Sequence, residues 1–192
     1  MKEKRDIPTS EQLANELERI RYIESFAKAM FSTFKSLIVV AAVSVLISTI
    51  FIPILRVTGT SMAPTLQNDE IVMCVKSSKF KSGDVVAFYY NNKVLLKRVI
   101  GVSGDIIDIA DDGTVTVNGE KIEEPYVNEF AYGECDIELP YQVPESRVFV
   151  MGDHRAVSID SRSTAVGCIA DEYIIGKVKY RLWPWDKKGN IN

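Results

Sequence analysis

Three kinds of hydrophobic pattern follow one another along the 192 residues of the chain. Apolar residues recur at helical spacing from about residue 9 to residue 35, an uncharged run covers residues 36–55, and short alternating runs begin near residue 57. Helical spacing predicts an amphipathic helix, a long uncharged run predicts a membrane-spanning helix, and alternation predicts β-strands. We therefore expect three parts: a segment of residues 1–35, a membrane span of residues 36–55 and a β-rich domain of residues 56–192.

The first part begins with charged residues 1–9, which we expect to be loosely ordered. A helix should start at Thr9, whose side chain and that of Gln12 have the spacing of a capping pair. Its apolar face is formed by Leu13, Leu17, Ile20, Ala27, Met30 and Phe34. Such a helix can bind a partner or a membrane surface, or it can simply precede the span.

The uncharged run has 20 residues between Lys35 and Arg56. At about 1.5 Å per residue it reaches about 30 Å, the thickness of the hydrocarbon core. A cleavable secretory signal has a shorter leader and a shorter apolar core, and a buried core helix is the other alternative. Three basic residues lie in the 15 positions before the run and one in the 15 after it. This asymmetry predicts a single-pass protein of the cell membrane, with a cytoplasmic N-terminus and an extracytoplasmic domain.

Short β-rich runs cover residues 71–75, 84–90, 94–102, 106–110, 114–117, 147–151 and 173–182. Turn signals such as Asp112-Gly113 and Asn118-Gly119 separate them. The predicted fold class is therefore mainly β, with short antiparallel strands that form a folded sheet or barrel-like domain. Residues 127–146 are expected to form a surface excursion, and the last ten residues a tail.

Composition excludes several classes of function. The net charge is −3 and no basic cluster occurs, so nucleic acid is not an expected partner. The three cysteines are widely separated, and they form neither a metal motif nor a disulfide framework. We expect no metal, no cofactor and no essential disulfide.

Two segments carry candidate chemistry. Ser61 lies in a turn of small residues, 59–66, close to the predicted membrane boundary. Lys97 interrupts an apolar strand pattern, where burial would lower its pKa and allow its amine to act as a base. Each has a simpler interpretation: serine is common in turns, and a strand lysine can extend its amine to solvent.

A third segment, residues 152–162, follows a short strand and contains two acids, two arginines and two serines. By itself it is typical of a polar loop that cross-links its neighbours. The three segments, in this order behind one membrane segment, resemble the conserved boxes of bacterial type I signal peptidases. Further matches occur at residues 83–88, 104–105, 117–119, 124–126, 175–177 and 183–184.

The resemblance implies a membrane-bound serine endopeptidase that removes signal peptides with a Ser-Lys dyad. Ser61 would be the nucleophile and Lys97 the general base, which Ser158 would orient. Arg98, Asp153, Asp160 and Arg162 would be ion-paired scaffold.

Three positions depart from the family pattern. Gly59 stands where several members carry a hydroxyl that helps to bind the oxyanion, and His154 stands where asparagine is usual. Val157 also replaces a polar residue. A histidine-assisted mechanism, with Asp153 orienting His154, therefore stays open.

The implied substrates are signal peptides of secreted preproteins, with small side chains at the first and third positions before the cleaved bond. An extended peptide could add to an exposed strand edge, with pocket walls from Val57, Met62, Leu66, Leu95 and Leu96. Two alternatives remain: a catalytically silent, membrane-anchored β-domain that binds peptides, and a self-cleaving Ser-Lys protease of the repressor type.

Overall fold

The computed structural model describes residues 9–191. Residues 1–8, for which we expected loose order, lie outside this range. The chain divides into two units, Met1–Ser48 and Thr49–Asn192, and each is described by itself.

From Ser10 onward, the N-terminal unit belongs to one helix, α1 (Ser10–Phe51). Its start is the predicted capping pair: the Thr9 N–H donates to Gln12 Oε1 at 3.0 Å, and the Gln12 N–H donates to Thr9 Oγ1 at 3.4 Å. The sequence predicted an amphipathic helix followed by a separate span. The structure has one continuous helix instead, because no glycine or proline occurs from residue 10 to residue 51. It is long and apolar enough to cross a membrane.

The helix ends before the predicted end of the uncharged run. Pro53 follows Phe51 by two residues, and proline cannot supply the N–H that a helix interior needs. Ile54 and Leu55, which the sequence assigned to the span, instead belong to the first strand of the β domain. The apolar run thus contributes residues first to α1 and then to β1.

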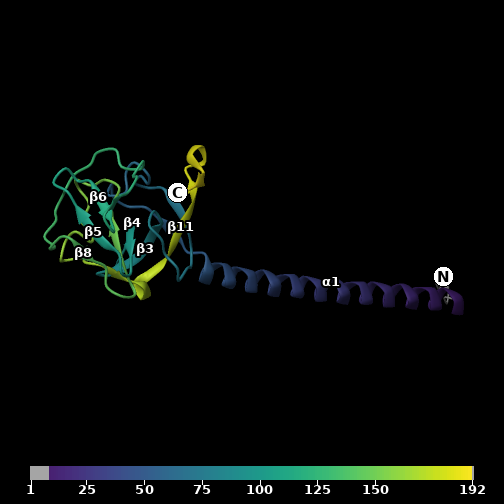
Figure 1. Cartoon of the computed structure of the whole chain (residues 1–192). Coiled ribbons are helices and arrows are strands. Elements are labelled where there is room, and N and C mark those ends of the chain that lie inside the picture. Colours follow the sequence, from purple (N-terminus) through teal and green to yellow (C-terminus); the bar gives the residue numbers. More distant parts are fainter. Residues whose placement is uncertain (1–8, 192) are drawn as a thin grey trace. The chain divides into compact units, whose positions relative to one another are not determined.

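Within the described residues, the β domain contains strands of 2 to 10 residues and two single-turn 3₁₀ helices. They are β1 (Ile54–Arg56), β2 (Ile71–Val75), β3 (Val85–Tyr90), β4 (Lys93–Val102), β5 (Ile106–Ile109), β6 (Val115–Val117), β7 (Glu120–Lys121), β8 (Tyr141–Gln142), β9 (Arg147–Met151), β10 (Ile169–Ala170), η1 (Asp171–Tyr173), β11 (Ile174–Trp183), η2 (Trp185–Lys187) and β12 (Gly189–Asn190). The predicted fold class, mainly antiparallel β preceded by a long apolar helix, is confirmed (Figure 1).

The strands form two sheets. The larger has the order β1-β2-β11-β3-β4-β9-β10, with β12 beside β11, and the smaller has the order β7-β6-β5-β8. In β3, Val85 and Ala87 enter one core cluster while Val86 and Phe88 enter another. The central strand is therefore apolar on both faces, because successive side chains point to opposite sides of the sheet.

Two sequence expectations for irregular structure were wrong. Residues 127–146 are not only a surface excursion, because β8 pairs with β5, and Val143 is buried. The last ten residues are not a free tail, because β12 pairs with β11 and Ile191 packs into the core with Val178. The core buries Val127 and Val143 in the first segment and Ile191 in the second.

Candidate active site

Ser61 lies in a tight turn that begins three residues after the end of β1. We call residues 59–66 the serine turn. Gly59 has φ of +92°, a conformation open to glycine, and two backbone hydrogen bonds, from Ala63 to Thr60 and from Leu66 to Met62, close the turn. Leu66 is fully buried and holds the turn against the core. Met62, the residue directly after Ser61, is also buried, with 2% of its surface exposed, so two apolar residues that follow Ser61 anchor the turn.

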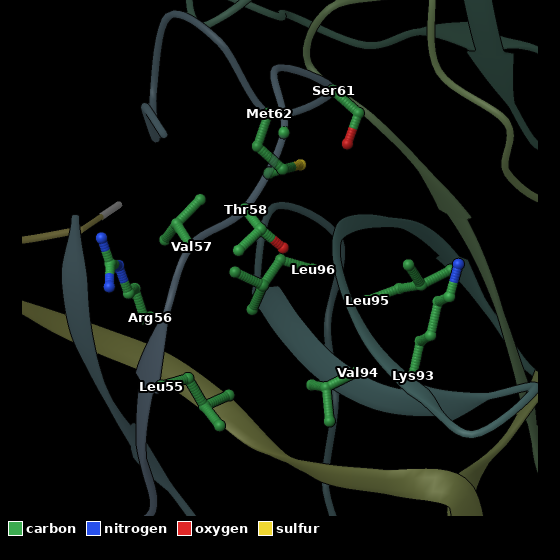
Figure 2. A pocket seen from close by; sticks show the side chains of 11 residues that line it. Leu55, Arg56, Val57, Thr58, Ser61, Met62, Lys93, Val94, Leu95 and Leu96 are labelled. Atoms are coloured by element: carbon green, nitrogen blue, oxygen red, sulfur yellow. The ribbon is translucent and has the colours of Figure 1, made fainter. Parts of the chain in front are cut away.

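A cavity of about 370 Å³ lies between this part of the chain and the first half of β4. Figure 2 shows its walls: residues 55–59 with Ser61 and Met62 on one side, and residues 93–96 on the other. Of the five predicted pocket residues, Val57, Met62, Leu95 and Leu96 line it. Leu66 does not, because its side chain is directed into the core.

The cavity is bordered by strand backbone without a strand partner. On the side of β4 facing β9, pairing starts at Arg98, which lies opposite Met151, so residues 93–97 have no partner strand there within the described residues. β1 pairs only with β2 and forms an edge of the larger sheet. Unpaired N–H and C=O groups at such edges can receive an extended peptide.

Lys97 is buried on β4, with 3% of its surface exposed. Its Nζ donates a hydrogen bond to Ser158 Oγ at 2.8 Å. Burial lowers the pKa of Lys97 from 10.5 to about 8; Asp160 and Asp153 act in the opposite direction, and Arg162 acts with burial. The amine is therefore neutral in a large fraction of molecules at mildly alkaline pH, as a general base requires.

Ser158 reaches Lys97 because β9 stops beside it. The last residue of β9, Met151, lies opposite Arg98, and the chain then turns at Gly152. A Cβ on Gly152 would lie 2.2 Å from Ser158 Oγ and 2.5 Å from the Ser61 carbonyl oxygen. The chain can fold this closely against both the serine turn and Ser158 only because residue 152 has no side chain.

Buried ion pairs fix the loop of residues 152–162. Arg98 donates to both carboxylate oxygens of Asp153, at 2.9 and 2.8 Å. Arg162 donates to Asp160, at 2.8 and 2.9 Å, and Asp160 accepts the Gly152 N–H at 2.9 Å. Bidentate pairs of this kind fix orientation as well as charge.

A third buried pair was not recognised as part of the site. Arg155 pairs with Glu124, and the Tyr126 ring lies under the Arg98 guanidinium, 3.8 Å from its carbon to the ring centroid. Arg155 and residues 124–126 were noted in the sequence only as parts of motifs. Their pairing joins segments 31 positions apart, which no local pattern reveals.

Two of the three departures from the family pattern, Gly59 and His154, have distinct surroundings. The Gly59 N–H donates to Asn68 Oδ1 at 2.9 Å, so this amide is already engaged. The backbone N–H of His154 donates to the Ser61 carbonyl at 3.1 Å. The Asp153 carboxylate accepts from Arg98 and Thr65, and no hydrogen bond between Asp153 and His154 occurs in the described part of the chain, which gives no support to Asp153 as an orienter of the imidazole.

Comparison with known proteins gives a consistent result. The family model described as signal peptidase, peptidase S26, matches residues 30–183. Signal peptidase IB of Staphylococcus aureus is 39% identical over 155 residues, covering 70% of this chain and 80% of that protein. Signal peptidase I of Bacillus licheniformis is 32% identical over 172 residues, covering 83% and 91%. A crystal structure of a signal peptidase I from Enterococcus faecalis covers 52% of this chain and 97% of its own, at 29% identity and a TM-score of 0.45.

Proposed function

This chain belongs to the signal peptidase family, peptidase S26, and from that premise we propose that it cleaves with a dyad of Ser61 and Lys97. Membership makes it a serine peptidase that removes signal peptides. One observation carries the assignment of residues: the buried Lys97 amine has a hydroxyl partner, Ser158 Oγ at 2.8 Å, and burial lowers its pKa to about 8. Since the partner is not a carboxylate, the amine can lose its proton and serve as a base.

In the proposed reaction, neutral Lys97 Nζ takes the proton of Ser61 Oγ while that oxygen attacks the carbonyl of the bond to be cleaved. The backbone N–H of Ser61, which has no hydrogen-bond partner among residues 9–191, donates to the developing oxyanion. Lys97 then gives the proton to the leaving amine, and an acyl ester on Ser61 remains. Water, deprotonated by Lys97, hydrolyses that ester and regenerates Ser61.

The substrate would bind as an added strand. The free edge of residues 93–97 and the edge of β1 border the same cavity, and Val57, Met62, Leu95 and Leu96 form its apolar walls. Alternate side chains of an extended peptide point to one face, so the first and third residues before the cleaved bond would meet the same walls. The small side chains that the resemblance implies at these two positions would contact these apolar walls.

The helix supports a membrane location for this chemistry. We infer that α1 anchors the chain in the cell membrane once, with its N-terminus in the cytoplasm and the β domain outside, where exported preproteins emerge. The excess of basic residues before the apolar run is the reason for this orientation.

Cleavage of a purified preprotein by the full chain in detergent tests the assignment. Ser61→Ala and Lys97→Ala should each abolish cleavage, and the double variant should be no worse than either one, because the two residues act as a unit. A double variant far slower than both single variants would contradict a shared role. Cleavage also separates the enzyme from the catalytically silent alternative, which would bind the preprotein without cutting it.

A further inference from the structure

A second cavity lies beside the serine turn, following Ser61 in sequence. It encloses about 290 Å³ and is bordered by Ala63, Gln67, Asn128, Glu129 and His154, among others. It has no lining residue in common with the cavity between β1 and β4. Ser61 and Met62 line the first cavity and Ala63 lines the second, so the serine turn separates the two.

The second cavity is close enough to Ser61 to contact a bound substrate. Two steps of the chain separate Ala63 from Ser61, which limits their Cα atoms to about 7.6 Å. The His154 backbone is closer still, because its N–H donates to the Ser61 carbonyl at 3.1 Å. An extended peptide advances about 3.3 Å per residue. Side chains one to three residues beyond the cleaved bond therefore come within reach of this cavity.

The walls of the cavity are fixed before any peptide arrives. The serine turn is tied to the loop of residues 152–162 by a hydrogen bond from Thr65 Oγ1 to Asp153. The wall that carries Glu129 is held by the buried Glu124–Arg155 pair and by Val127, which is 8% exposed. Cross-linking of this kind keeps a binding site organised and reduces the entropy cost of binding.

Two polar groups in this cavity have no protein partner. The buried Nδ1 of His154 has no hydrogen-bond partner among residues 9–191. Glu129 forms no ion pair with any residue in that range, whereas the Asp153 carboxylate beside it is neutralised by Arg98. The cavity thus carries one uncompensated negative charge, that of Glu129, and the imidazole of His154 forms part of its wall. It suits a polar peptide segment and favours a cationic side chain over an anionic one.

We propose that this cavity is the subsite for the leaving side of the substrate, the first residues of the mature protein, and that His154 and Glu129 set its preference. This inference rests on the proposed function, because the proposed cleavage defines which part of the substrate leaves. Binding of a peptide to the cavity does not itself require cleavage. His154 would be a positioning and specificity residue here and would not act as the base.

The chain has a single histidine, so the imidazole signals of His154 are unambiguous in an NMR spectrum. Full-length Ser61→Ala protein in detergent would be titrated with three tetrapeptides that represent a mature N-terminus and differ only in Lys, Gln or Glu at the second residue. The Lys peptide should shift the imidazole signals at the lowest concentration and the Glu peptide at the highest. Glu129→Gln should make the Lys and Glu peptides equivalent. Absence of any shift with all three peptides would overturn the subsite.

A kinetic arm separates this inference from the proposed function. Three preprotein substrates would carry Lys, Gln or Glu at the second residue after the cleaved bond. The wild-type chain should cleave the Lys substrate with the highest kcat/KM and the Glu substrate with the lowest. We expect a difference of about threefold between these two, because the charge is partly solvated. Glu129→Gln should remove this order, while Glu138→Gln, an exposed acid outside the cavity, should keep it. Equal cleavage of all three by the wild-type chain refutes the subsite alone. If no substrate is cut, the proposed function fails, and the NMR titration still decides whether the cavity binds the peptides.

Discussion

Replacing Lys97 with methionine should stabilise the β domain at neutral pH while it removes activity. Methionine keeps an unbranched side chain of similar length and removes the ammonium. Lys97 is 3% exposed, and burial lowers its pKa from 10.5 to about 8. That pKa difference corresponds to about 3 kcal/mol. Below pH 8, where Lys97 is protonated in the folded protein, the free energy of unfolding is lower by this amount than it would be with a neutral lysine.

The sign of the pH dependence follows from proton binding. Between pH 8 and pH 10.5 the unfolded chain keeps the Lys97 proton while the folded chain has released it, so the wild-type protein gains stability as the pH rises. Lys97→Met lacks this gain. It also loses the hydrogen bond to Ser158, which is worth about 1 kcal/mol. The variant should be about 2 kcal/mol more stable than wild type at pH 7 and about 1 kcal/mol less stable above pH 10.5.

Equilibrium unfolding of the detergent-solubilised chain, followed by tryptophan fluorescence, measures this difference. Both tryptophans, Trp183 and Trp185, belong to the β domain, so the signal reports the unit that contains Lys97. Other titrating groups, such as the buried thiols, are common to both proteins and cancel. Lys177→Met is the matched control: Lys177 pairs with Asp84, so its replacement should lower stability. A stability difference between Lys97→Met and wild type that does not change from pH 7 to pH 10.5 would refute the argument.

Other predictions concern the same loop and the topology. Gly152→Ala should reduce kcat at least tenfold, because its Cβ would fall 2.2 Å from Ser158 Oγ; wild-type turnover would show that the contact is not required. His154→Asn should keep the pH midpoint of activity near 8, the pKa of Lys97, and a midpoint that disappears would make the histidine the base. Protease added outside spheroplasts should digest residues after Arg56 and leave α1 intact, and a protected β domain would reverse the proposed orientation.

Local patterns predicted the parts of this fold that depend on local physics. The strands at residues 71–75 and 147–151 have the predicted bounds, and the Thr9–Gln12 cap is present. Alternation and capping act within a few residues, and a single sequence displays both. The end of α1 was placed four residues too late, because hydropathy does not distinguish an apolar helix from the apolar edge strand that follows Pro53.

The sequence was less informative where long-range pairing decides the structure. Ser158 and Lys97 are 61 positions apart in the chain. From the sequence, only the resemblance to a known family predicted that these two side chains interact. Leu66 has the composition of a pocket wall, yet it fills the core, since the direction of one side chain in a tight turn does not follow from hydrophobicity. The pairing of Glu124 with Arg155 likewise depends on how the loops meet after the sheets have formed.

Two of the buried arginines, Arg98 and Arg162, give a physical reason for the number of charges around one reactive amine. Asp153 and Asp160 lie near Lys97, and each raises its pKa by favouring the ammonium form. A free carboxylate in that position would oppose the effect of burial and keep the lysine protonated. Arg98 and Arg162 bind these two carboxylates directly, and the positive charge of Arg162 itself lowers the pKa of Lys97. The ion-paired residues therefore have an electrostatic role as well as a positional one. Two acids fix the loop, and the arginines limit the rise that these acids cause in the pKa of Lys97. Burial then has the largest effect on this pKa, so Lys97 can lose its proton and act as a base.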